Sequence, residues 1–147
     1  MIVHARTPEQ QAHLLEYITR AIGVLPRAMV GDMPYHAMGA VRDGKLVGCA
    51  LFTNWRGHSI EAHVCGGPGW VTRGDLAELF AYPFGHLDVR RIMLVIARNN
   101  KKARRFAERL GFQVKCVADD EYGEGKDGIV YAMKRADCKW LRGHQRA

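Results

Sequence analysis

The sequence predicts an α+β (mixed α/β) fold, in which helices flank one central and mostly antiparallel sheet. Three observations support this fold class. Asp43-Gly44 separates two apolar stretches, as in a β-hairpin with a type I′ turn. Residues 91–97 form a continuous apolar run that is typical of a central strand. Apolar residues recur at helical spacing at 8–22 and again at 98–109.

Length and composition indicate one folded domain over residues 1–147. Hydrophobic residues make up 48% and charged residues 25%, which excludes a disordered chain and a disulfide-stapled scaffold. No apolar run approaches the roughly 20 residues that a membrane-spanning helix needs, and no secretory signal is visible. We therefore expect a cytoplasmic location, no membrane partner and reduced cysteines at positions 49, 65, 116 and 138.

The N-terminal half predicts one helix followed by three antiparallel strands. Thr7-Pro8-Glu9-Gln10 provides a capping box and a proline at the first helical position, and the apolar spacing continues to Ile22. The strand beginning at Ser59 alternates apolar and polar residues, as a half-buried strand does. The expected elements are helix 8–22, a connection at 24–34, and strands 36–41, 46–55 and 59–65.

The C-terminal half predicts a strand–loop–helix–strand unit, whose two strands should be parallel with a right-handed crossover. Asn99 or Asn100 can cap the second helix of this half, and Gly111 can close it. The expected elements are helix 75–82, strand 91–97, helix 98–109, and strands 112–117 and 129–133.

The loop from Gly66 to Gly74 joins a strand to a helix, and it is rich in glycine. Glycines let the backbone approach a ligand closely, and the unpaired N–H groups of a helix start attract anions. The loop matches neither the dinucleotide-binding nor the Walker A pattern. It is therefore either an anion-binding loop, with Arg73 supplying a charge, or an ordinary tight connection.

Charge is distributed unevenly along the chain, whose net charge is +7. Residues 1–89 carry seven Lys/Arg and eight Asp/Glu, a net −1, whereas residues 90–147 carry fifteen and seven, a net +8. Six of the basic residues fall in helix 98–109, against Glu108 alone. This helix could meet a phosphorylated cofactor, nucleic acid or an acidic protein surface, or it could present only a solvated face. The cysteine and histidine spacings typical of zinc sites are missing, so the sequence predicts no metal.

A second motif follows the buried strand. Arg91-Ile92, Asn100, Ala103 and Glu108-Arg109-Leu110-Gly111-Phe112 have the spacing found in GNAT-type N-acetyltransferases, so the chain resembles that family. Within it, the sequence is similar to the branch that acetylates N-termini of ribosomal proteins and to phage-encoded relatives. Tyr82-Pro83-Phe84 and the ending Tyr131 to Arg135 also resemble that branch. The resemblance covers roughly residues 35–135.

The resemblance implies a GNAT-like sheet in which two parallel strands splay apart, and acetyl-CoA as the acyl donor. It implies that pantetheine pairs with the edge near His63 to Cys65 and that the pyrophosphate sits on the glycine-rich loop. The residues expected to bind the cofactor are Val64, Cys65, Trp70, Val71, Thr72, Arg73, Gly74, Asn100 and Ala103. Only a fragment of the family's loop motif is present, and Ala107 stands where many members have a tyrosine acid.

Acetyl transfer to an amine needs a base and a donor that stabilises the oxyanion. Glu61 and His63 lie on one strand with the same side-chain parity, so Glu61 is the first candidate base and His63 the second. Tyr122, in the acidic loop 119–127, is the candidate acid, with Tyr131 as an alternative. Each of these residues could instead be structural or solvated.

These features predict an N-acetyltransferase that moves acetyl from acetyl-CoA to an amine by direct attack in a ternary complex. The acceptor would be a protein N-terminus, a lysine or a small-molecule amine, and the enzyme a monomer or a homodimer. The acidic loop could attract a cationic amine. Alternatives are a non-catalytic module that binds CoA, protein or nucleic acid, and an enzyme that modifies a nucleic-acid base. Nucleic acid would bind through the basic helix 98–109.

Overall fold

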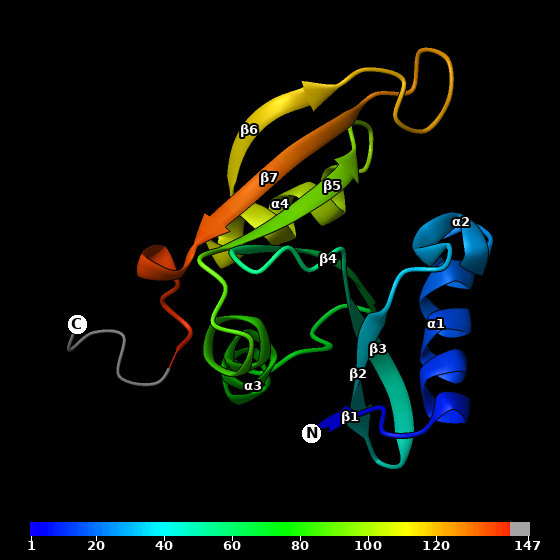
Figure 1. Cartoon of the computed structure of the whole chain (residues 1–147), viewed down its shortest axis with the longest axis vertical. Helices are drawn as coiled ribbons and strands as arrows, with labels where there is room; N and C mark the ends of the chain where they lie inside the picture. Colours follow the sequence, from blue (N-terminus) through cyan, green and yellow to red (C-terminus); the bar gives the residue numbers. More distant parts are fainter. Residues whose placement is uncertain (142–147) are drawn as a thin grey trace.

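The computed structural model describes residues 1–141 and shows one seven-stranded sheet in the order β1-β2-β3-β4-β5-β7-β6 (Figure 1). The strands are β1 (Ile2–His4), β2 (Tyr35–Arg42), β3 (Lys45–Thr53), β4 (Ser59–Gly66), β5 (Arg91–Ala97), β6 (Gln113–Ala118) and β7 (Gly128–Lys134). The helices are α1 (Pro8–Ile22), α2 (Pro26–Val30), α3 (Arg73–Ala81) and α4 (Lys101–Leu110), with a π-helical turn at Tyr82–His86 and a 3₁₀ turn at Arg135–Asp137.

The predicted order of elements is confirmed, with two additions. The connection expected at 24–34 contains the short helix α2, which begins at Pro26. A short edge strand, β1, pairs with β2 and was not predicted, because three residues are too few to show a period of two. Helix α3 begins two residues earlier than expected, because Thr72 and Asp75 form a capping box.

The Asp43-Gly44 hairpin has the predicted geometry. Both residues adopt positive φ, 52° and 74°, as a type I′ turn requires. The hairpin pairs β2 with β3, and β3 then pairs with β4, all antiparallel. The crossover through α3 makes β4 and β5 parallel, as predicted. The sheet is therefore a mixed sheet with a parallel pair near its centre.

Two hydrophobic clusters cover opposite faces of the sheet. We call the first the α1 face, where Leu14, Leu15 and Ile18 of α1 pack on alternate residues of β2 and β3. We call the second the α3–α4 face, where residues of both helices pack on the other side chains of the strands. Figure 1 shows α1 beside β3, with α4 behind β5 and β7. Among residues 1–141, no helix is long and apolar enough to cross a membrane.

Candidate active site at the strand notch

The parallel strands β4 and β5 pair over only part of their length. The paired residues are Ser59 with Arg91, Ile60 with Ile92 and Glu61 with Met93. Each strand continues beyond the last pair, β4 to Gly66 and β5 to Ala97, without a partner in the other. We call this unpaired interval the notch. It lies at the predicted position, on the strand that carries Glu61 and His63.

The direction of the backbone in the notch follows from the bonds that flank it. The Gly67 N–H donates a hydrogen bond to the carbonyl of Val47 on β3. Every second residue before Gly67 therefore also directs its backbone N–H and C=O toward β3. The backbone of Val64 therefore faces the notch, whereas that of Cys65 pairs with β3. On β5, Arg98 N–H bonds Asp127 O, which by the same alternation turns the backbone of Val95 into the notch. Both walls thus present backbone groups that have no partner in the opposite strand.

Glu61 and His63 project on the α1 face, on the wall formed by β4. The ring Nε2 of His63 lies 3.2 Å from Oγ1 of Thr53, which is 2% exposed. Asn54 donates its amide to Glu61 Oε1 at 3.1 Å. Burial lowers the pKa of His63 below its ordinary value, although Glu61 opposes this shift. His63 is therefore a neutral imidazole at pH 7, and Glu61 is held in a fixed orientation.

Tyr122 reaches the opposite wall of the notch from the acidic loop. Its hydroxyl donates a hydrogen bond to Val95 O at 3.0 Å. Burial, followed by the charge of Glu121, raises the pKa of Tyr122, so the phenol keeps its proton at neutral pH. The side chain is still 42% exposed. Tyr131, the alternative acid, is fully buried and bonded to Arg104 and Glu108, which gives it a structural role.

Trp70 has a structural role that the cofactor prediction did not anticipate. Its buried ring lies over the paired glycines Gly48 and Gly66, where an added Cβ would come within 2.1 Å and 2.2 Å of ring atoms. The backbone N–H of Trp70 donates a hydrogen bond to Gly67 O, and its backbone carbonyl accepts one from the Arg42 side chain. These contacts give Trp70 a packing role, and its predicted contact with the cofactor stays a prediction.

The start of α3 leaves two backbone donors available. Thr72 is the N-cap, and its side chain and N–H are both bonded to Asp75. Burial alone would raise the pKa of Asp75, but the hydrogen bonds with Thr72 hold it below its ordinary value. Val71 packs against the core. Arg73 and Gly74 occupy the first helical turn, where N–H groups have no intrahelical partner.

Asn100 and Ala103 form the cap of α4. Asn100 Oδ1 accepts a hydrogen bond from Ala103 N–H at 3.2 Å, so this pair orders the first turn. Ala107, which stands where the family resemblance expects a tyrosine, is 1% exposed on the α3–α4 face. Asn100 thus caps the helix that follows the β5 wall, and it is exposed there.

The cysteine on β4 is not an activated nucleophile. Burial raises the pKa of Cys65 to about 11, and that of its cross-strand partner Cys49 to about 12. A thiol must ionise to attack a carbonyl, so neither residue is suited to carry an acetyl group at neutral pH. Cys65 contributes to the α1 face, where it packs near Tyr17.

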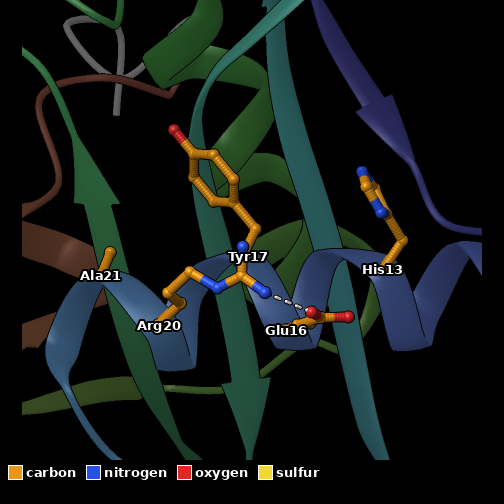
Figure 2. Close-up of a pocket in the computed structure, with 5 residues that line it drawn as sticks. All are labelled: His13, Glu16, Tyr17, Arg20 and Ala21. Carbon is orange, nitrogen blue, oxygen red and sulfur yellow. Dashed lines mark hydrogen bonds and ion pairs between the residues drawn. The ribbon is translucent and has the colours of Figure 1, made fainter.

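A groove of about 400 Å³ runs along α1 on the same face as Glu61 and His63 (Figure 2). It is lined by His13, Glu16, Tyr17, Arg20 and Ala21. Glu16 and Arg20 form an ion pair with each other. Burial, and then the thiols of Cys65 and Cys49, raise the pKa of Tyr17, and Tyr17 packs against the same hydrophobic cluster as Cys65. All five lining residues belong to α1.

Solved structures share this arrangement of elements, although no family model and no curated protein matches the sequence. A spermidine N-acetyltransferase from Vibrio cholerae, solved with CoA and spermine, is 16% identical with a TM-score of 0.66. The match covers 92% of this chain and 96% of that chain. A structure from Desulfovibrio desulfuricans, assigned to the GNAT family, is 20% identical, covers 91% and 98%, and has a TM-score of 0.67.

A third structure, described as an acetyltransferase, is 22% identical over 92% of this chain and 93% of that chain, with a TM-score of 0.65. Together these similarities show that the chain has the GNAT fold, as the sequence resemblance predicted. At these identities the comparison concerns the fold, so the branch that modifies ribosomal proteins stays a prediction.

Proposed function

We propose that this protein is an N-acetyltransferase that transfers acetyl from acetyl-CoA directly to an amine. The observation that carries the proposal is the notch between β4 and β5, where the backbones of Val64 and Val95 lack strand partners. A pantetheine amide can pair with such an edge as a further strand would. A titratable pair, Glu61 and His63, lies beside the same edge.

The acyl donor would enter from the α3–α4 face. The N–H groups of Arg73 and Gly74 suit a pyrophosphate, because they lie at a helix start and have no intrahelical partner. Val64 would pair with the pantetheine arm, and Asn100 with the neighbourhood of Ala103 would line it beyond the notch. The remaining predicted residues act indirectly: Thr72 caps α3, and Val71 and Cys65 pack beside the site.

The acceptor amine would arrive from the α1 face. Its nitrogen attacks the thioester carbonyl, the carbon–sulfur bond breaks, and the amine proton passes to Glu61, directly or through water. The N–H of Val64 suits the role of oxyanion donor. Tyr122 can donate a proton to the leaving thiolate. It would thereby take the role of the tyrosine acid that many family members have at the position of Ala107. Direct attack is favoured because the nearby thiols are protonated.

The acceptor is best matched by a cationic amine. Asp119, Glu121 and Glu124 in the loop next to Tyr122 form no ion pair within residues 1–141. Their carboxylates attract a positively charged molecule to the side from which the acceptor approaches. A polyamine, a lysine and a protein N-terminus all meet this condition. The sequence resemblance to the ribosomal-protein branch favours the N-terminus, whereas the Vibrio cholerae structure with spermine favours the polyamine.

A thiol-release assay with acetyl-CoA and a panel of polyamines, lysine peptides and N-terminal peptides tests the proposal. We expect turnover with at least one cationic acceptor, and a fall of about 100-fold for Glu61→Gln with acetyl-CoA affinity retained. Glu9→Gln, which removes an exposed carboxylate from α1, is the matched control and should keep full activity. Calorimetry that detects no acetyl-CoA binding would refute the enzyme and leave a non-catalytic module.

A further inference from the structure

We propose that the exposed face of α4 binds the phosphate backbone of nucleic acid, independently of the acetyl-transfer site. The face carries four basic residues, which we call the basic row: Lys101, Lys102, Arg105 and Arg109. All four are exposed, and none forms an ion pair or a side-chain hydrogen bond within residues 1–141. The helix therefore presents a compact positive surface to solvent.

The neighbouring basic residues Arg98 and Arg104 differ from the basic row because their side chains bond to other residues of the fold. Arg98 pairs with Asp127 at 3.3 Å. Arg104 donates to Tyr131 Oη at 3.1 Å and to Arg98 O at 3.0 Å. Glu108, the acid of this helix, accepts a hydrogen bond from Tyr131 at 2.7 Å and is turned toward that contact. The acidic partner within the helix is thus engaged elsewhere, and the row stays uncompensated.

The electrostatics of the isolated helix disfavour this arrangement. Lys101 and Lys102 occupy the first turn, at the positive end of the helix dipole, and this turn contains no acidic residue. Lys101, Arg105 and Arg109 follow one another at intervals of four, which places like charges side by side on the helix surface. An external anion that binds the row would relieve both effects. A merely solvated face needs no such clustering.

The fold also places a second aromatic residue beside the helix, whose own Phe106 packs inward near Trp70. Trp140 donates Nε1–H to Leu110 O, at the C-terminal end of α4. Arg73 and Lys139 lie over its ring, at 5.5 Å and 4.9 Å from the centroid. The basic row therefore ends beside a half-buried tryptophan that adds one further cation, Lys139, because Arg73 belongs to the proposed cofactor loop. Along the sequence this residue is too far from α4 to suggest a common surface.

A nucleic acid fits this surface better than an acidic protein does. Arg109 follows Lys101 by eight positions, so the row extends for about 12 Å at the rise of an α-helix. Its charges are of one sign throughout, which matches the closely repeated negative charges of a phosphate backbone. The contacts would be independent of base sequence, and their strength would depend steeply on salt.

Fluorescence anisotropy with labelled single-stranded RNA and duplex DNA tests this proposal on the full chain. The test variant is the triple change Lys101→Gln, Arg105→Gln, Arg109→Gln, since glutamine preserves helix propensity. The control is Arg6→Gln, Arg27→Gln, Arg56→Gln, which removes the same charge from exposed side chains of the N-terminal half that form no ion pair or side-chain hydrogen bond within residues 1–141. Acetyl-CoA affinity is measured for both variants.

We expect the test variant to bind RNA about 100-fold more weakly at roughly 0.1 M salt, with a salt slope smaller by about 2, as loss of three phosphate contacts requires. The control should stay within about threefold of the wild type. Equal losses in both variants, or no binding by the wild type, would overturn the proposal. Binding to polyglutamate with none to nucleic acid would also overturn it, in favour of an acidic protein. Loss of acetyl-CoA affinity in the test variant would assign the row to the cofactor instead.

Discussion

The two faces of the sheet present different chemical groups around the notch. On the α1 face, polar and titratable side chains cluster next to the unpaired strand edge, and Glu61, His63 and Thr53 all carry side-chain hydrogen bonds. On the α3–α4 face, the same strand edge is covered by packed apolar groups, above all the ring of Trp70 over Gly48. The α3–α4 face offers a ligand backbone donors at a helix start more than reactive side chains.

This difference assigns cofactor binding to one face of the sheet and the chemical step to the other. A large cofactor with a phosphate end is suited to the face that is rigid and rich in backbone donors. An amine is suited to the face where carboxylate and imidazole groups are oriented by neighbours. The cofactor and the amine would meet at the notch, because β4 and β5 are not paired with each other there. Each experiment below disturbs one face and asks whether the other keeps its function.

The largest effect should come from Gly48→Ala on the α3–α4 face. Its new Cβ would lie 2.1 Å from Cε3 of Trp70, so the ring must move and the loop that precedes α3 must move with it. We expect the free energy of unfolding to fall by about 3 kcal/mol, at the upper end of the range for overpacked cores. Acetyl-CoA affinity should fall with it. Urea unfolding and calorimetry measure the two quantities.

Gly67→Ala is the matched control in the same loop, because an added Cβ there meets nothing within 4 Å and φ is not positive. It should leave the free energy of unfolding within about 0.5 kcal/mol of the wild type. If Gly48→Ala unfolds at the same urea concentration as the wild type, Trp70 is not the element that fixes the loop.

The next effect concerns a histidine pair that has no part in the proposed chemistry. On the α3–α4 face, His4 Nδ1 lies 2.9 Å from His36 Nε2, and His36 stacks on Tyr82 with centroids 4.0 Å apart. Two nitrogens this close share one proton at most. Burial, and then His4 and His86, lower the pKa of His36 to about 4, and burial with Arg6 lowers that of His4 against the pull of Glu78.

A lowered folded pKa means that the unfolded chain binds more protons, so this contribution is complete above pH 6.5 and is lost as pH falls toward about 4. We expect the free energy of unfolding to decrease by about 1 to 2 kcal/mol between about pH 7.5 and about pH 5, allowing for solvent screening of the half-exposed ring. His36→Gln should flatten this dependence. His58→Gln, at an exposed histidine, should leave it as steep as in the wild type.

Much of the fold could be predicted because its signals are local. A capping box at Thr7, a type I′ turn at Asp43-Gly44 and an apolar run at 91–97 each lie within one window of sequence. The edge strand β1 has no such signal, since its partner β2 lies more than thirty residues away. The position of the notch, which depends on where one strand pair ends, was predicted from the resemblance to the GNAT family and not from a local signal.

The site was harder to predict because its contacts join distant segments. Parity placed Glu61 and His63 together, but the hydrogen bonds from Thr53 and Asn54 depend on the register between β3 and β4. Trp70 was assigned to the cofactor because it lies in the loop, and only the glycines facing it reveal its packing role. The contact of Tyr122 with Val95 O depends on how a long loop folds back, which no spacing encodes.

The smallest effect should come from Asn54, which orients the proposed base on the α1 face. Asn54 adopts a left-handed conformation with φ 53°, so Asn54→Gly keeps the backbone while it removes the amide that holds Glu61. We expect kcat to fall about 5- to 10-fold, because a freely rotating carboxylate spends less time near the amine. KM for acetyl-CoA and the melting temperature should stay close to their wild-type values.

A double-mutant cycle with Glu61→Gln decides whether this effect passes through the carboxylate. If Asn54 acts by positioning Glu61, Asn54→Gly should lower kcat no further once Glu61 is replaced, since the group that it orients no longer takes a proton. Additive losses in kcat would instead mean that Asn54 contacts the acceptor or shapes the β3–β4 turn. A loss of acetyl-CoA affinity would contradict the separation of the two faces, because Asn54 lies on the α1 side and the cofactor would bind from the other.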